Sequence, residues 1–106
     1  MKSSNVSTQA GSGFAMQFAN GIHISVQFSA AHYCSNRDTD ASMEIHSSTY
    51  RHMQSLYSPN AEVLIWNDDR DLELMGHVSV EEIGRLIGAC QSASSLDDVE
   101  KEILND

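Results

Sequence analysis

The chain of 106 residues is poor in bases, and this shortage argues against two kinds of partner. It has 6 Lys and Arg against 15 Asp and Glu, so its formal net charge at pH 7 is −9 with neutral His. Direct nucleic-acid binding requires a basic face, and the sequence therefore predicts no direct contact with nucleic acid. The same charge disfavours binding to an anionic membrane surface.

Long apolar runs and paired cysteines are also missing. No stretch approaches the roughly 20 apolar residues of a membrane-spanning helix, and the N-terminus shows no apolar signal segment. The two cysteines, Cys34 and Cys90, form neither a CxxC motif nor a disulfide framework. We therefore expect a reduced intracellular protein that makes no membrane contact.

The residues that are present fit one small domain. Hydrophobic residues make up 41% of the chain and charged residues 20%, as in ordinary globular proteins. Residues 1–13 are mostly Ser, Asn, Thr, Gln and Gly, a composition that predicts a flexible tail. Residues 14–106 are expected to form a single α+β domain.

A first β-hairpin is predicted over about residues 14–28. Apolar residues there alternate with others on both sides of Asn20-Gly21, which is a turn signal. A three-residue loop, Ala19 to Gly21, pairs Phe18 with Ile22 and places both apolar sets on one face. Gly21 is then expected in the left-handed region as a G1 bulge.

A second hairpin is predicted over about residues 61–75. The expected register pairs Ile65 with Leu72 and Val63 with Leu74, and joins the strands through a tight turn at 67–70. Three apolar side chains then fall on the opposite face, where either the 40–57 segment or a second subunit of a homodimer would cover them: Leu64, Trp66 and Met75. For Trp66 alone, a place in the core is the preferred interpretation.

Two helices follow the second hairpin. Ser79 to Glu82 reads as a capping box that opens a helix over about 79–91, with an apolar stripe from Val80 to Cys90. Gly84 and Gly88 are interpreted as sites of close approach to the sheet, and Ser95 precedes a short final helix. Residues 40–57 are either an amphipathic helix or a loop. The predicted fold is a four-stranded antiparallel sheet from the two hairpins, with the 79–91 helix packed on one face.

The acidic excess is concentrated in one part of the chain. Residues 1–60 are balanced in charge, whereas residues 61–106 hold twelve acids and three bases, which accounts for the whole −9. Such acids either form a solvated face or attract a basic partner. Two non-acidic loop residues could join such an interface, because an exposed tyrosine supplies contact area and an arginine binds anions. The candidate partner-binding residues are Asp68, Asp69, Asp71, Glu73, Glu81, Glu82, Tyr33 and Arg37.

Signals for catalysis are weak. Cys34 is a conceivable nucleophile with His32 or His46 as its base, but nothing in the sequence fixes that geometry. The spacings of His and Cys match no zinc pattern, and no glycine-rich phosphate loop is present. We therefore predict no catalytic residue, no metal and no cofactor.

Several segments resemble small phage- and prophage-encoded proteins: Asn20–Phe28, Tyr33–Arg37, Ser58–Val63 and Gly76–Ser79. The resemblance spans about residues 18–90 and implies an anti-defence role of the anti-CRISPR type. The expected function is a non-enzymatic inhibitor in the host bacterial cytoplasm, which binds a basic protein or ribonucleoprotein complex that handles nucleic acid. The alternatives are a homo-oligomeric scaffold or structural phage protein, and a small ligand-binding or Cys-dependent hydrolytic protein.

Overall fold

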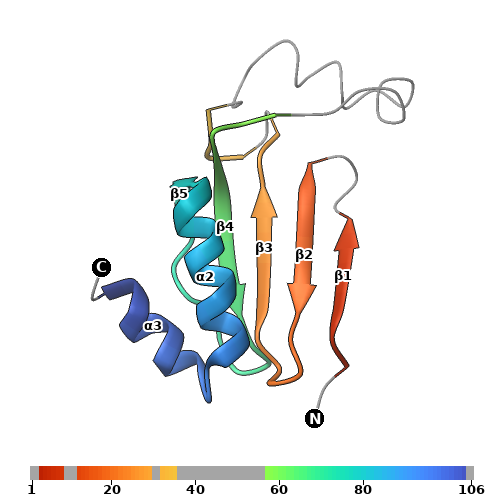
Figure 1. Ribbon diagram of the computed structural model, residues 1–106, viewed down its shortest axis with the longest axis vertical. Helices are drawn as coiled ribbons and strands as arrows, with labels where there is room; N and C mark the ends of the chain where they lie inside the picture. The colour runs from red at the N-terminus through yellow and green to blue at the C-terminus, as the bar shows by residue number, and fades with distance from the viewer. Residues whose placement is uncertain (1–2, 9–11, 30–31, 36–56, 105–106) are drawn as a thin grey trace.

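Five strands form one antiparallel sheet in the order β1-β2-β3-β4-β5, and two helices follow it in the chain (Figure 1). The computed structural model describes residues 3–8, 12–29, 32–35 and 57–104. The class is α+β, as the sequence predicted. The elements are β1 Asn5–Thr8, β2 Gly13–Gln17, β3 His23–Gln27, β4 Asn60–Trp66, β5 Met75–Ser79, α2 Val80–Ser92 and α3 Leu96–Leu104.

The hairpin of β2 and β3 has the predicted register and turn. The Phe18 N–H donates to the Ile22 carbonyl at 2.9 Å, and the Gly21 N–H donates to the Phe18 carbonyl at 2.9 Å. Gly21 has φ 86°, the left-handed conformation that the three-residue loop requires. The two apolar sets consequently share one face, and Ile22, Ile24 and Val26 are buried.

The sheet has one strand more than predicted, because β1 lies in the segment expected to be a tail. It pairs with β2 from Asn5 opposite Gln17 to Thr8 opposite Phe14. All four β1 residues are exposed. The strand is held by backbone pairing to β2 rather than by burial. Its sequence therefore has no alternating apolar pattern from which it could be predicted.

The second hairpin differs from the prediction at its outer strand. The Leu72 N–H donates to the Ile65 carbonyl at 2.8 Å, in agreement with the expected pairing of these two residues. However, β5 spans 75–79 instead of 71–75, and Met75 rather than Leu74 faces Val63. The register changes by one residue between the Ile65–Leu72 contact and the Val63–Met75 pair, which places Met75 instead of Leu74 on the face of Val63. It shifts once more between the Val63 and Ala61 pairs.

The first of these shifts divides the three residues predicted to form a dimer interface. Met75 lies on the same face as buried Val63 and packs against the core, whereas Leu64 and Trp66 are half-buried on the other face. Trp66 is also not in the core, contrary to the interpretation preferred from its sequence. The prediction that these three residues share one face is therefore wrong.

The α2 helix begins directly after β5. The Ser79 hydroxyl accepts the Glu82 N–H at 3.2 Å, which confirms Ser79 as the N-cap. Leu86 and Cys90 are buried against the sheet, but Val80, predicted on the same stripe, is 59% exposed.

The explanation of the helix glycines as contact points is wrong. A Cβ added to Gly84 or Gly88 would have no atom within 4 Å, so neither glycine makes a close approach.

The core lies between α2 and the β3–β5 half of the sheet, and α3 packs beside α2 (Figure 1). On the helix side of the sheet, Phe14 and Met16 of β2 and Phe18 just after it are only partly buried. The candidate helix over 40–57 lies outside the described residues apart from Tyr57, which precedes β4 and is 80% exposed.

Candidate functional site

A tight turn between β4 and β5 presents the first predicted acids. The Asn67 side-chain oxygen accepts the N–H groups of Asp69 at 2.9 Å and of Arg70 at 3.0 Å, and the Asn67 N–H donates to the Arg70 carbonyl. An asparagine that closes its own turn in this way fixes the loop backbone. Asp68 and Asp69 at the tip are consequently held exposed.

Arg70 connects this turn to α3. Its guanidinium forms ion pairs with Asp97 at 2.5 Å and with Glu100 at 3.5 Å. The hydrogen bond with Asp97 is the main cause that raises the pKa of Arg70 above its ordinary value. Two α3 acids are therefore neutralised in part by a base of the turn, and they contribute less to an acidic surface than their sequence positions suggest.

A second arginine neutralises one of the predicted site residues. Arg85 of α2 forms ion pairs with Glu82 and, at 3.1 Å, with Glu102 of α3. Glu82 is therefore part of the contact between the helices. Glu81 is exposed but lies in the first turn of α2, at the opposite end of the sheet from the 67–70 turn (Figure 1). The predicted acids consequently do not form one surface.

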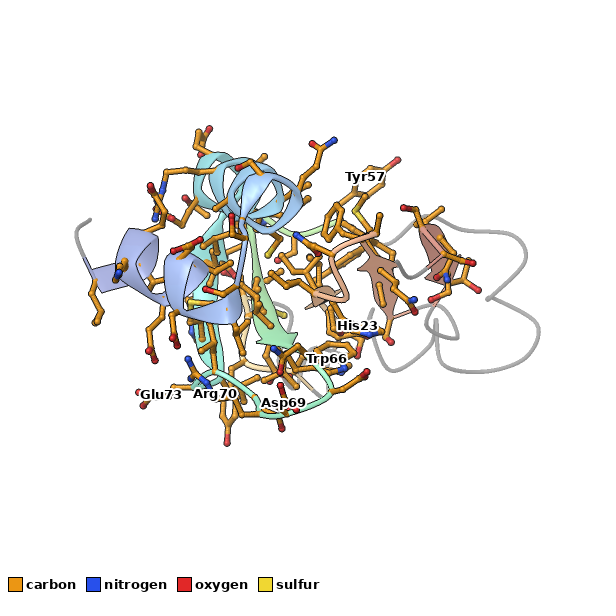
Figure 2. All side chains as sticks on the ribbon, turned by 90° about the horizontal axis from the view of Figure 1, so that it is seen from below. His23, Tyr57, Trp66, Asp69, Arg70 and Glu73 are labelled. Atoms are coloured by element: carbon orange, nitrogen blue, oxygen red, sulfur yellow. The ribbon has the colours of Figure 1, made fainter. Side chains whose placement is uncertain are left out.

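Three of the predicted acids remain as a group, and we call Asp69, Asp71 and Glu73 the acidic edge. All three are exposed, and no Lys or Arg of the described ranges forms an ion pair with them. Figure 2 shows Asp69 and Glu73 on the side of the sheet away from α2, with Arg70 between them. Among the described residues, the edge thus keeps a negative charge that no paired base offsets, and such a charge acts at long range.

An aromatic stack adjoins the acidic edge. His23 of β3 and Trp66 of β4 are cross-strand partners, and their rings stack with centroids 4.9 Å apart and an interplanar angle of 11°. Trp66 also forms an isolated antiparallel β-bridge with Asp71 through the backbone, and this pairing places the stack beside the acidic edge. Both rings lie on the same side as Asp69 in Figure 2. The sequence reasoning missed this pair, because the predicted registers lie within each hairpin and do not set how β3 pairs with β4.

The two non-acidic candidates lie elsewhere. The Tyr33 N–H donates to the Glu62 carboxylate at 2.9 Å, and its carbonyl accepts the His77 N–H at 2.8 Å, so this residue is fixed along β5. Its side chain is 48% exposed. Arg37 lies outside the described residues.

Both cysteines are buried. Cys34 is 2% exposed, and its thiol donates to the Ser29 carbonyl at 3.5 Å. Cys90 is fully buried, and burial raises the pKa of its thiol to about 12. His32 bonds the Ser29 hydroxyl at 2.6 Å through Nδ1. These contacts explain Cys34 and His32 as parts of a folded loop, and His46 lies outside the described residues.

A search of the described ranges found no group of three or more side chains suited to hold a metal ion. None of the helices in those ranges is long and apolar enough to span a membrane.

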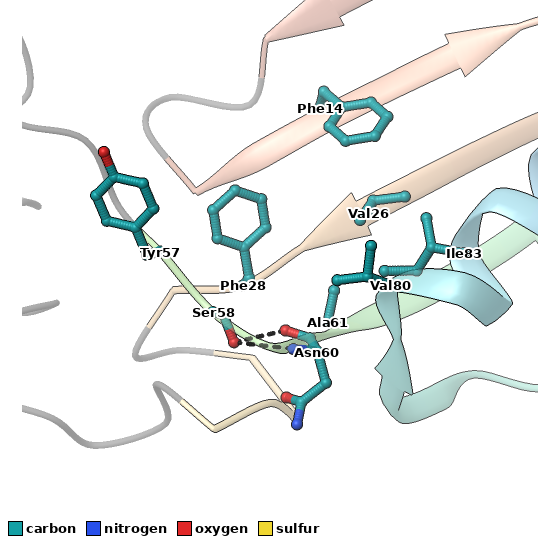
Figure 3. A pocket seen from close by; sticks show the side chains of 9 residues that line it. All are labelled: Phe14, Val26, Phe28, Tyr57, Ser58, Asn60, Ala61, Val80 and Ile83. Carbon is teal, nitrogen blue, oxygen red and sulfur yellow. Dashed lines mark hydrogen bonds between the residues drawn. The ribbon is translucent and has the colours of Figure 1, made fainter.

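An apolar groove of about 290 Å³ opens on the helix side of the sheet. It lies between the first turn of α2 and the start of β2, and the exposed Tyr57 borders it (Figure 3). The Ser58 hydroxyl within it is already bonded to the backbone of Asn60. Its lining brings together Phe14, Val26, Phe28, Tyr57, Ser58, Asn60, Ala61, Val80 and Ile83.

Comparison of the chain with protein-family models, with curated proteins and with solved structures found no match in any of the three.

Proposed function

We propose that the protein is a non-enzymatic inhibitor of the phage-encoded, anti-defence type, acting in the host bacterial cytoplasm. It binds a basic host protein or ribonucleoprotein complex that handles nucleic acid, and it contacts no nucleic acid itself. The observation that carries the proposal is the acidic edge, in which Asp69, Asp71 and Glu73 remain exposed without a paired base among the described residues.

Charge and aromatic surface have separate roles in this proposal. Exposed carboxylates raise the association rate with a basic surface more than they raise the final affinity. The adjoining His23–Trp66 stack supplies rigid, partly apolar area of the kind that carries binding energy at interfaces. The acidic edge would therefore bring the two proteins together, and Trp66 would slow their separation.

Asn67 gives the Asp69 end of the acidic edge a fixed backbone. The turn is closed by three hydrogen bonds to Asn67. Preorganised groups lose less conformational freedom on binding, so the entropic cost of ordering them reduces the binding free energy less. A groove that normally holds a nucleic-acid backbone presents spaced cations, and a rigid row of carboxylates suits such a surface.

The test is capture of partners from a defence-proficient bacterial lysate, with quantitative mass spectrometry at low and high salt. We expect a nucleic-acid-handling complex that is retained at low salt and released at high salt, because exposed charges are screened by ions. The variant D69N/D71N/E73Q should lose that complex. The matched control E81Q/D98N/E102Q removes the same amount of charge from α2 and α3 and should retain it.

Two results contradict the proposal. One is a partner retained equally by both triple variants, which would show that the acidic edge does not contribute. The other is equal loss with both variants, which would show that only the net charge of the chain matters. Trp66→Ala tests the adjoining stack separately, and it should raise the dissociation rate more than it lowers the association rate.

A further inference from the structure

The two outer strands of the sheet, β1 and β5, differ in what covers their outer edges. The β5 edge is covered in part, because the Tyr33 carbonyl accepts the His77 N–H and the Tyr33 side chain lies against Gly76. The β1 edge has no further strand beside it among the described residues. Its sequence Asn-Val-Ser-Thr contains no charge and no proline, the features that usually protect an edge strand from pairing.

The hydrogen bonds of the neighbouring hairpin show which β1 groups point outward. Phe18 and Ser12, which flank β2, form backbone hydrogen bonds with Ile22 and Phe28, which flank β3. Bonding alternates along a strand, so the even-numbered residues of β2 bond to β3 and the odd-numbered ones bond to β1. The β1 partners of Gln17 and Ala15 are Asn5 and Ser7. The backbone N–H and C=O groups of Val6 and Thr8 therefore face away from the sheet.

Val6 is also the open end of an apolar row that crosses the sheet. Ile65 faces Ile24, Ile24 faces Met16, and Met16 faces Val6. Burial declines along this row, from 0% exposure at Ile65 and Ile24 to 68% exposure at Val6. The row therefore ends in solvent at the free edge.

The distribution of charge favours one occupant of this edge. Residues 3–36 contain no Asp, Glu, Lys or Arg, so β1, β2 and β3 carry no charge except through His23. The edge lies on the far side of the sheet from α3 (Figure 1). Three strand spacings, about 14 Å, separate β1 from β4, and the Debye length is about 8 Å at physiological salt. Two copies of this acidic chain can approach here with little repulsion.

We propose that a second copy of the chain pairs with β1 along this edge, antiparallel, to form a continuous ten-stranded sheet with a two-fold axis. Val6 lies opposite Val6 of the second copy, and Ser4 lies opposite Thr8. This register uses the outward groups of Val6 and Thr8 and joins the two apolar rows. The same surface serves both copies, as two-fold symmetry requires. This interface is separate from the acidic edge and does not depend on the proposed function.

The first test is sedimentation velocity of the full chain from about 5 µM to about 500 µM. The average mass should rise with concentration from the 11.7 kDa of one chain toward twice that value. Val6→Pro removes the outward-facing backbone N–H of residue 6 in each copy, and it removes no hydrogen bond between β1 and β2. It should weaken dimerisation by about tenfold or more. The control Val6→Thr keeps the N–H and should change the dissociation constant by no more than about threefold.

The second test reads the backbone directly and needs no variant. The amide hydrogens of Val6 and Thr8 should exchange more slowly at the high concentration than at the low one, whereas exchange at Asp69 should not change. A wild-type chain that stays monomeric throughout overturns the proposal. So does a dimer that Val6→Pro leaves intact, since it would use another surface. If the Val6→Pro variant does not fold, Thr8→Lys gives a second check, because a charge on the edge strand should also weaken dimerisation.

Discussion

The side-chain amide of Asn20, in the turn between β2 and β3, donates hydrogen bonds to the carbonyls of Cys90 at 2.7 Å and of Ala93 at 3.0 Å. Its oxygen accepts the Ile22 N–H at 3.0 Å. The last turn of a helix leaves carbonyls without partners inside the helix. One residue of the hairpin turn therefore caps the C-terminal end of α2 and joins the sheet to the helix layer.

This contact predicts that Asn20→Ala lowers the free energy of unfolding by about 1–3 kcal/mol. Asn20→Asp should be less stable still at low salt, because a carboxylate cannot donate to the carbonyls and adds negative charge at the negative end of the helix. Urea unfolding at two salt concentrations measures both effects. An alanine variant as stable as the wild type would show that the cap contributes nothing.

The left-handed conformation of Gly21 predicts a loss of stability on substitution. Gly21→Val should cost about 1–2 kcal/mol or more, because a side chain at φ 86° meets the following carbonyl. Gly84→Ala is the matched control within one helix, and it should stabilise the protein by about 0.5–1 kcal/mol, since a methyl group there meets no neighbour. Thermal unfolding of the two variants should therefore shift in opposite directions.

The buried thiol of Cys90 predicts a loss of stability at high pH. Its pKa is about 12 in the folded protein against an ordinary value of 9.0, so the unfolded chain loses the proton first. The contribution is complete below about pH 9 and declines by up to about 1.4 kcal/mol for each pH unit from there toward pH 12. Cys90→Ala should have a lower free energy of unfolding at neutral pH, but that free energy should fall less steeply above about pH 9 than in the wild type. Equal slopes for the two proteins would contradict the assignment.

Arg70 predicts opposite effects on stability and on binding. Arg70→Gln should reduce the free energy of unfolding only slightly, because its ion pairs with Asp97 and Glu100 are exposed to solvent. It also makes the region of the acidic edge more negative, so association with a basic partner should become faster. Stopped-flow binding at several salt concentrations measures the rate. A slower association would count against electrostatic attraction at this edge.

Local rules were sufficient where the chain signals its own structure. The pairing of Phe18 with Ile22 and the N-cap at Ser79 both follow from short sequence patterns, and both are confirmed. The position of β5 did not follow, because the register of β5 against β4 changes after the Ile65–Leu72 contact and again between the Val63 and Ala61 pairs, and neither change leaves a signature in the residues themselves. β1 was missed for a related reason: its four exposed residues are held by pairing alone.

The candidate site was predictable in composition but not in arrangement. The sequence identified the acids, yet it could not show that Arg85 pairs with Glu82 or that Arg70 pairs with α3. Nor could it show that α2 starts at the end of the sheet away from Asp69. Which charges remain uncompensated depends on tertiary contacts, and these decide which of the acids can act on a partner.

The uneven distribution of charge across the sheet has a further consequence for motion. With β1 to β3 almost uncharged and the whole excess of −9 in residues 61–106, the molecule has a large electric dipole moment. Near a positively charged surface, such a molecule experiences a torque as well as an attraction. It would rotate during approach until the β4–α3 side leads and β1 trails, so that its orientation is largely set before any side chain makes contact.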